Sequence, residues 1–260
     1  MSESSEARSA GSVQSLARGL AVIRSFDADN PRMTLSEVAT RTGLSRATAR
    51  RFLLTLRDLG YVRSDGKIFE LTSEVLQLGY SYLSSAPLPQ LVSPVLEDLS
   101  AAMGESASAS VLEGDSIVYI ARVHTRAIMQ VGISVGTRFP ALATSMGRVL
   151  LAGAPAQVVT ELLDGPLPAL TPLTVTDPER LREILREVAE QGYCFVDQEL
   201  SLGLRSVAVP VHGPDGTIVC ALNVSLSVVD SRTPEQALAA VLPALQQAAQ
   251  RVEQALAARR

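Results

Sequence analysis

The 260-residue chain has no tryptophan, two histidines and two cysteines. Neither histidine has a second ligand at the spacing of a metal site, so we expect neither a metal nor a cofactor. Cys194 and Cys220 lie in the apolar stretches GYCFVD and IVCALNV. Such surroundings are typical of buried free thiols and argue against a disulfide or a nucleophile. With so few histidines and cysteines, the chain has few of the side chains that most often serve as nucleophiles, bases or metal ligands.

Long hydrophobic runs and a secretion signal are also missing. No apolar run approaches the roughly 18 residues that a membrane span needs. The N-terminal stretch MSESSEARSAGS is polar and has no apolar segment of the kind found in signal peptides. We therefore expect a cytoplasmic protein that makes no membrane contact and begins with a disordered tail over residues 1–11.

Positive charge is scarce overall but locally concentrated. The formal net charge is −4. Residues 1–72 carry 11 Arg and Lys against 8 Asp and Glu, a net charge of +3, so the remaining residues carry −7. A mildly basic head on an acidic body predicts that only the head meets a polyanion.

The first 72 residues follow the pattern helix, helix, short turn, helix, hairpin. The expected caps and breaks are Ser12, Pro31, Thr34 with Glu37 three residues later, Gly43, Ser45, Gly60 and the turn Asp65–Gly66. Pro31 is expected in a loop, DADNPRM. This order of elements predicts a winged helix-turn-helix over residues 12–72.

Four arginines lie in TGLSRATARRFLLTLRDLGYV, residues 42–62. The spacing of Ala49, Phe52, Leu53 and Leu56 predicts one buried helix face. The opposite side would then present base-reading side chains to the major groove, and neighbouring residues would bind phosphates. The predicted base readers are Arg46, Thr48 and Arg50, and the predicted phosphate contacts are Ser45, Arg51, Arg63 and Lys67, with Arg57 free for a phosphate or for Asp58. The alternative is a merely solvated helix face, which the order of elements disfavours.

The rest of the chain predicts an α+β body. A linker helix is expected over residues 73–88, and the body would span 89–260. Expected helices cover 91–103, 143–153, 155–165, 177–192 and a final long helix interrupted or kinked near Pro243. Expected strands cover 106–112, 116–123, 127–133, 193–197, 205–212 and 217–227.

Several of these stretches resemble the IclR family of bacterial transcription regulators. SVQSLARGLAVIRSF and TLSEVATRTGLSRATARRFLLTLRDLGYV look like its DNA-binding domain, and VGTRFPALATSMGRVLLAG and VDQELSLGLRSVAVPV look like its effector domain. The similarity covers residues 12–255. The body is most similar to the branch that regulates aromatic acid catabolism through the β-ketoadipate pathway, the PcaR/PcaU/PobR group.

The resemblance implies a fold, partners and a set of effector residues. The fold would be a winged helix-turn-helix, a linker helix and a GAF/profilin-like effector-binding domain. The partners would be palindromic double-stranded DNA, a small organic acid and a second copy of the chain, with tetramers in some members and RNA polymerase left open. The implied effector residues are Ser145, Met146, Asp197, Leu204, Ser206, Asn223 and Ser225, with an apolar wall from Ile128, Val131 and Phe139.

The residues themselves favour a ligand at this place. Hydroxyls at Ser145, Ser206 and Ser225 and an amide at Asn223 are unusual on the inward side of apolar segments. A buried polar group without a partner costs about 1–3 kcal/mol, which a small oxygenated ligand would offset. The alternative is that these groups bond the local backbone in a packed core. An arginine for the ligand's carboxylate could be Arg122, Arg126, Arg138 or Arg205.

Three other functions compete with an aromatic-acid regulator. One is an IclR-type regulator of another carbon source, such as small keto acids. Another is a DNA-binding protein without an effector, which the large acidic body argues against. The third is an enzyme, for which the carboxylates Asp197 and Glu199 are weak evidence. We therefore predict no catalytic residues.

Overall fold

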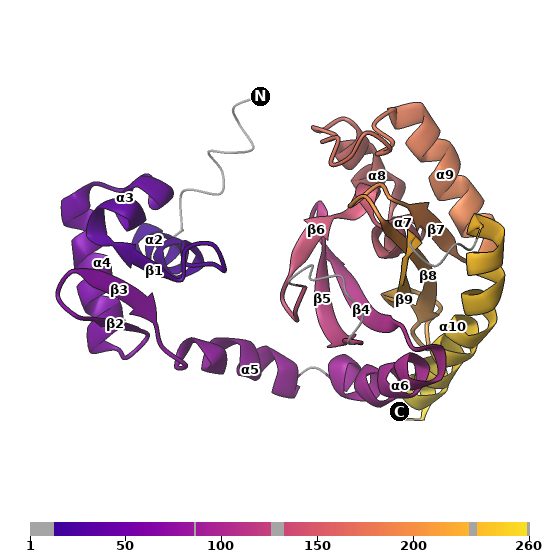
Figure 1. Ribbon diagram of the computed structural model, residues 1–260, viewed down its shortest axis with the longest axis horizontal. Helices are drawn as coiled ribbons and strands as arrows, with labels where there is room; N and C mark the ends of the chain where they lie inside the picture. The colour runs from indigo at the N-terminus through magenta and orange to yellow at the C-terminus, as the bar shows by residue number, and fades with distance from the viewer. Residues whose placement is uncertain (1–12, 86, 126–132, 229–232, 259–260) are drawn as a thin grey trace. The chain divides into compact units, whose positions relative to one another are not determined.

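A computed structural model describes residues 13–85, 87–125, 133–228 and 233–258 (Figure 1). Contacts divide the chain into two compact units, Met1–Ser85 and Ala86–Arg260. We refer to them as the N-terminal unit and the C-terminal unit.

The N-terminal unit is a helix-turn-helix with a three-stranded wing. Its elements are α2 (Gln14–Arg24), β1 (Arg32–Thr34), α3 (Leu35–Thr42), α4 (Arg46–Asp58), β2 (Val62–Ser64), β3 (Ile68–Leu71) and α5 (Val75–Ser85). The strand order is β1-β3-β2, and both pairings are antiparallel. The sequence predicted a loop where β1 lies. That prediction was wrong because Arg32, Met33 and Thr34 pair with β3, a partner that local sequence does not reveal.

Capping residues set the helix boundaries as predicted. The Thr34 hydroxyl accepts the Glu37 N–H, and the Glu37 carboxylate accepts the Thr34 N–H at 2.7 Å, forming a capping box. Gly43 ends α3 in the left-handed region, at φ 65°, which favours glycine. Ser45 caps α4. The helix α2 begins after Val13, which makes no side-chain cap; the predicted cap Ser12 lies outside the described residues.

The C-terminal unit is a six-stranded antiparallel sheet between two helical layers. Its elements are α6 (Pro87–Met103), β4 (Ser106–Glu113), β5 (Ser116–Val123), β6 (Arg138–Pro140), the 3-10 helix η1 (Ala141–Ala143), α7 (Ser145–Ala152), α8 (Ala156–Leu163), α9 (Pro178–Gln191), β7 (Cys194–Asp197), β8 (Leu204–His212), β9 (Ile218–Ser227) and α10 (Pro234–Ala257). The strand order is β6-β5-β4-β9-β8-β7.

Each face of this sheet has its own hydrophobic core. On one face α6 and α10 pack against the strands through residues such as Leu96, Leu222 and Leu245. On the other face α7 and α9 pack through residues such as Met146 and Leu185. In Figure 1 the two long helices of the first face, α6 and α10, lie next to each other at the bottom and right of this unit. The functional cavity described below lies on the second face.

Three elements differ from the sequence prediction. Helix α6 begins at Pro87, four residues before the predicted start. Prolines are tolerated in the first turn of a helix, because the N–H groups that they lack have no hydrogen-bond partner there. Strand β6 was not predicted, and most of the strand expected at 127–133 lies outside the described residues. Helix α10 runs without interruption past Pro243. Of the two possibilities predicted there, the interruption was wrong, and the kink stays a prediction.

Candidate functional sites

Helix α4 buries one face and exposes its arginines on the other. Ala49, Leu53 and Leu56 are buried in the core of the N-terminal unit, and Phe52 is half-buried against the same core. Arg46, Arg50 and Arg51 are exposed. Among the described residues, no carboxylate pairs with any of these three. Their charge is therefore available to an external anion.

The other predicted DNA contacts are partly engaged within the chain. Ser45 Oγ accepts the Thr48 N–H at 3.2 Å and lies 2.9 Å from Thr48 Oγ1, so both hydroxyls already serve the helix start. Arg63 on the wing pairs with Glu70 at 2.8 Å. Lys67 is exposed at the hairpin turn. Arg57 pairs with its neighbour Asp58 at 2.9 Å, the second of the two roles considered for it.

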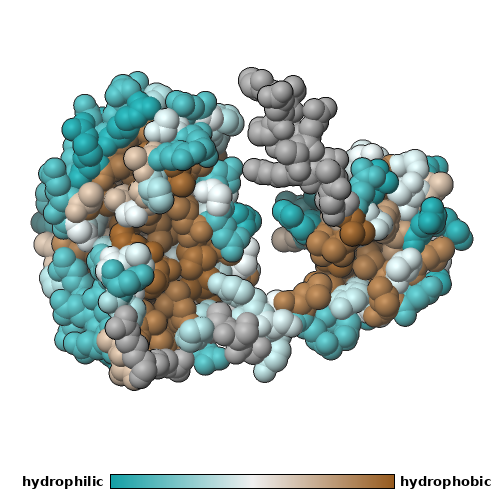
Figure 2. Space-filling model, turned by 180° about the vertical axis from the view of Figure 1, so that it is seen from behind, coloured by the Kyte–Doolittle hydropathy of each residue, from teal (hydrophilic) through white to brown (hydrophobic). Residues whose placement is uncertain are grey.

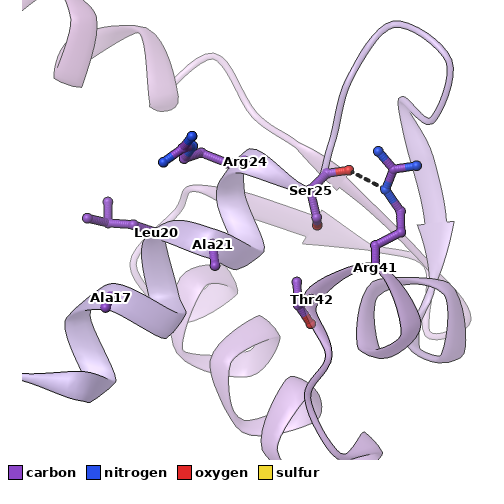
Figure 3. A pocket seen from close by; sticks show the side chains of 7 residues that line it. All are labelled: Ala17, Leu20, Ala21, Arg24, Ser25, Arg41 and Thr42. Carbon is purple, nitrogen blue, oxygen red and sulfur yellow. Dashed lines mark hydrogen bonds between the residues drawn. The ribbon is translucent and has the colours of Figure 1, made fainter. Parts of the chain in front are cut away.

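An open groove lies beside the helix-turn-helix. Figure 3 shows Ala17, Leu20 and Ala21 of α2 on one side, and Arg41 and Thr42 of α3 on the other. Arg41 Nε donates to the Ser25 carbonyl at 3.0 Å, and its Nη2 pairs with Asp27 at 2.5 Å. The hydrogen bond from Asn30 and, less, the Arg41 charge hold the pKa of Asp27 below its usual value. The groove thus has Ala17, Leu20 and Ala21 on its α2 side, and the guanidinium of Arg41, already paired with Asp27, on the other.

Exposed hydrophobic residues gather on the N-terminal unit. Figure 2 shows brown surface there among teal hydrophilic surface. The large exposed hydrophobic side chains of this unit are Val13, Leu16, Leu20, Leu59, Leu76, Leu78, Tyr80 and Tyr82. Most of them lie on or next to α2 and α5. Leu76 and Tyr80, both on α5, are 72% and 70% exposed.

The C-terminal unit contains a small cavity between α7 and the sheet, with a polar network in its wall. Ser145 Oγ lies 2.6 Å from Ser206 Oγ. Asn223 Nδ2 donates to Ser206 Oγ at 2.9 Å and to Ser225 Oγ at 3.2 Å. Asn223 is 2% exposed, and its Oδ1 is a buried side-chain atom with no hydrogen-bond partner. The wall therefore presents an unsatisfied acceptor.

Apolar side chains form the rest of the cavity. The lining residues beyond the polar network are Tyr119, Ile133, Ala143, Thr144, Met146, Val196, Leu200 and Leu204. Met146 Sδ accepts a hydrogen bond from Ser110 Oγ at 3.2 Å, which fixes this side chain. Burial raises the pKa of Tyr119 to about 12, so its hydroxyl stays protonated at neutral pH. The cavity volume is about 20 Å³.

Six of the ten predicted effector residues line this cavity: Ser145, Met146, Leu204, Ser206, Asn223 and Ser225. Asp197 does not line it, because β7 alternates and Val196 occupies the inward position; Asp197 instead pairs with Arg205 at 3.0 Å. Phe139 packs edge-on against Tyr119, with ring centroids 5.9 Å apart, and is absent from the lining. Ile128 and Val131 lie outside the described residues, as does Arg126.

Tyr119 is the lining residue that sequence alternation conceals. The β4–β5 register shifts between Ala109 and Ser110. A bulge of this kind inserts one extra residue in a strand and re-aims the side chains beyond it. In a regular strand, Tyr119 and Arg122 would point to opposite faces, because they are three residues apart. The bulge turns both to the same face of the sheet. Tyr119 lines the cavity, and Arg122 Cζ lies 5.8 Å from the Tyr119 ring centroid.

A buried ion pair holds the cavity's helix in place. Arg148 on α7 donates from Nη1 and Nη2 to the two carboxylate oxygens of Glu199, both at 2.7 Å, and from Nε to the Leu142 carbonyl at 2.8 Å. Glu199 Oε2 also accepts the Val175 N–H at 2.9 Å. Ser145, three residues before Arg148, and Leu200, next to Glu199, both line the cavity. The sequence marked Glu199 only as weak evidence for an enzyme, and it did not reveal Arg148 as the partner of this carboxylate.

The two cysteine thiols are unsuited to nucleophilic catalysis. Cys194 and Cys220 are buried and free, and burial raises the pKa of each thiol to about 12. Both therefore stay protonated at neutral pH, when a nucleophile must be a thiolate. His212 bonds Glu253 at 2.8 Å on the surface. Within the described ranges, no cluster of three His, Cys, Asp or Glu residues could hold a metal ion.

Comparison with known families accounts for both units. The IclR helix-turn-helix domain matches residues 15–66, and the bacterial transcriptional regulator IclR C-terminal domain matches residues 80–254. The chain belongs to the IclR family. This IclR-family chain is thus a DNA-binding transcriptional regulator with an effector-binding domain. In the part of it that the structure describes, no helix combines the length and the hydropathy that crossing a bilayer requires.

The IclR-family relatives include regulators of aromatic catabolism. The chain is 46% identical over 216 residues to the Pca regulon regulatory protein of Pseudomonas putida, covering 82% of this chain and 74% of that one. It is 38% identical to the p-hydroxybenzoate hydroxylase transcriptional activator of Acinetobacter baylyi, covering 95% and 93%. An IclR homolog from Microbacterium hydrocarbonoxydans, solved with 4-hydroxybenzoate, superposes with a TM-score of 0.81 at 28% identity, covering 94% and 99%.

Proposed function

We propose that this regulator controls genes for the breakdown of an aromatic acid in the cytoplasm, and that this acid, or the aliphatic keto acid β-ketoadipate, binds the cavity between α7 and the sheet. The candidate effectors are 4-hydroxybenzoate, protocatechuate and β-ketoadipate. The proposal has a DNA-binding half and an effector half, which different residues support.

The DNA-binding half rests on the exposed face of α4. Arg46 and Arg50 lie in the first turns of the helix, where a recognition helix meets base edges, and neither pairs with a carboxylate of the residues that the structure describes. Arginine pairs bidentately with guanine in the major groove. Arg51 and Lys67 are exposed and suit phosphates, whereas Arg63 would first have to leave Glu70. Operator binding therefore falls mainly to α4.

The effector half rests on one observation, the unpaired Oδ1 of Asn223 in the cavity wall. A buried acceptor without a donor costs about 1–3 kcal/mol. Turning the amide would exchange the unpaired acceptor for an unpaired donor, so either orientation leaves a polar group for a ligand to satisfy. A ligand hydroxyl among three serine hydroxyls and this amide supplies the missing bond. The apolar lining suits an aromatic ring.

Ligand entry requires the walls to separate. A volume of about 20 Å³ has room for roughly one water molecule. A benzoate-sized ligand must therefore displace α7 from the strands that carry Ser206 and Asn223. Such a ligand binds the expanded arrangement and shifts the population toward it, and this differential affinity is the source of regulation.

The exposed hydrophobic residues of α2 and α5 suit a second copy of the chain. A palindromic operator presents two equivalent half-sites, which a two-fold dimer matches. We propose that the N-terminal units pair through this surface. Substitution of Leu16, which is 63% exposed, by glutamate should shift the mass measured by sedimentation toward the monomer. An unchanged mass would exclude this surface as the dimer interface.

Calorimetry on the full chain tests the effector half. We expect binding heat with at least one of the three acids and none with pyruvate. Ser145→Leu should abolish that heat while operator affinity persists, because the larger side chain fills a cavity of about 20 Å³. Thr160→Leu, on the exposed face of α8, is the matched control and should bind as the wild type does.

The alternatives predict different results. Binding of pyruvate in place of the aromatic acids would assign the chain to a keto-acid pathway. The absence of heat and of any melting-temperature shift with all four compounds would contradict the effector half altogether.

A further inference from the structure

We infer that Arg122 binds the carboxylate of the effector and so selects acids over neutral analogues. The inference rests on the proposed function, since it concerns the same cavity. It adds a residue outside the cavity lining that sequence reasoning left undecided among four arginines.

Arg122 lies on the cavity's face of the sheet, in line with Asn223. Arg122 on β5 opposes Ser108 on β4, and Ser108 opposes Asn223 on β9. Directly opposed residues of antiparallel strands point to the same face, and adjacent strands lie about 4.8 Å apart. Arg122 Nη1 donates to Ser108 Oγ at 2.9 Å. Its guanidinium is therefore one buried hydroxyl away from the amide in the cavity wall.

The charge of Arg122 has no acidic partner among the described residues. The two other arginines on described strands of this sheet do have one: Arg138 pairs with Glu113 at 3.0 Å and Arg205 with Asp197 at 3.0 Å. The groups that contact the Arg122 guanidinium are neutral or aromatic. They are Ser108, the ring of Tyr119 and His124 Nδ1, which accepts from Nε at 3.2 Å.

Burial makes this unneutralised charge costly. Arg122 is half-buried, and desolvation lowers its pKa, opposed by Tyr119. Desolvation together with the Arg122 charge also lowers the pKa of His124, which favours the neutral imidazole whose Nδ1 accepts from Arg122 Nε. An anion placed against the guanidinium would offset the desolvation.

The free donors of Arg122 match a carboxylate. A guanidinium has five N–H groups, of which Nε–H and one on Nη1 are engaged. The remaining three are the two on Nη2 and the second on Nη1, so Nη2 can donate to one carboxylate oxygen while Nη1, its neighbour in the planar fork, has an N–H left for the other. The polar network of Ser145, Ser206 and Asn223 would then bind the ligand's other oxygen, with the ring between them against Met146 and Tyr119.

The test compares an acid with its neutral isostere. Calorimetry on the full chain would measure 4-hydroxybenzoate and 4-hydroxybenzamide against the wild type, Arg122→Gln, Arg122→Lys and the matched control Arg138→Gln. We expect the wild type and Arg138→Gln to prefer the acid by about 10- to 100-fold, as a charge-assisted bond predicts. Arg122→Gln should lose that preference and retain its affinity for the amide, and Arg122→Lys should fall between because it lacks the planar fork.

The outcomes separate the inference from the proposed function. If Arg122→Gln keeps the wild-type ratio of acid to amide, the inference is overturned while the effector site stands. If the wild type binds neither compound nor the other two acids, the proposed function falls first. Should Arg122→Gln fail to fold, Ser108→Ala carries the test. Loss of the Nη1 contact should lower affinity for the acid several-fold and leave the amide unaffected, and equal effects on both would overturn the inference.

Discussion

The buried pair Arg148–Glu199 allows a quantitative test of the cavity's architecture. Glu199→Gln conserves size and removes one charge. The Arg148 side chain is 2% exposed and that of Glu199 10%, so water cannot take the carboxylate's place. One carboxylate oxygen becomes an NH₂ group, which sets a donor against the donors of Arg148 or of Val175. Removing one partner of a buried pair costs about 3–5 kcal/mol, because the other charge stays buried.

Thermal unfolding of the full chain measures this cost. For a folded unit of this size, each kcal/mol lowers the melting temperature by roughly 2–4 °C, so we expect a fall of roughly 6–20 °C in the transition of the C-terminal unit. The matched control is Glu113→Gln, whose pair with Arg138 has side chains 54% and 43% exposed. An exposed pair contributes about 0–1 kcal/mol, so this transition should barely move. Equal shifts for the two variants would refute the reasoning.

Three further predictions concern the other contacts. Arg50→Ala should weaken specific operator binding by about 1–3 kcal/mol in fluorescence anisotropy, whereas Arg57→Ala, already paired within the chain, should change it little; equal losses would contradict a base-reading role. Gly147→Ala should lower stability by about 1–3 kcal/mol, because its Cβ would lie 2.0 Å from a backbone carbonyl oxygen of η1, and Gly79→Ala, which meets open space, is the calorimetric control. Hydrogen bonds at the start of α3, first of all from the Thr34 backbone N–H, hold the pKa of Glu37 below its usual 4.5. The ionised carboxylate therefore stabilises the fold fully above pH 4.5, and this contribution is lost as the pH falls through the lowered pKa. NMR titration should show the lowered pKa, and Glu37→Gln should abolish this part of the pH dependence of stability.

Local patterns predicted the N-terminal unit well because its information is local. The capping box of Thr34 and Glu37, the cap at Ser45 and the apolar spacing of Ala49, Leu53 and Leu56 are each set by residues three or four apart. Strand β1 escaped prediction because it is defined by its pairing with β3, more than thirty residues further along. A strand of three residues is too short to show the alternation of polar and apolar residues by which strands are predicted.

The cavity was predicted in part for a related reason. The polar residues of its wall stand out on apolar strands, and the sequence could single out Ser206, Asn223 and Ser225. Tyr119 could not be assigned, because the bulge opposite Ala109 and Ser110 reverses the alternation that a reader of β5 would assume. Asp197 was misplaced by one strand position, since Val196 takes the inward side. The pairing of Arg148 with Glu199 spans 51 residues and has no local signal.

Operator affinity measured with and without effector tests the central claim most directly. Fluorescence anisotropy of a labelled operator duplex, titrated with the full chain at fixed salt, would be recorded in the presence and absence of saturating 4-hydroxybenzoate, protocatechuate or β-ketoadipate. The account predicts a change in Kd of about 5- to 150-fold with one of the acids, the range that coupling energies between two sites usually give, and predicts that Ser145→Leu loses this change while still binding the operator. Identical binding curves with and without every acid, for a chain that binds the operator, would contradict it.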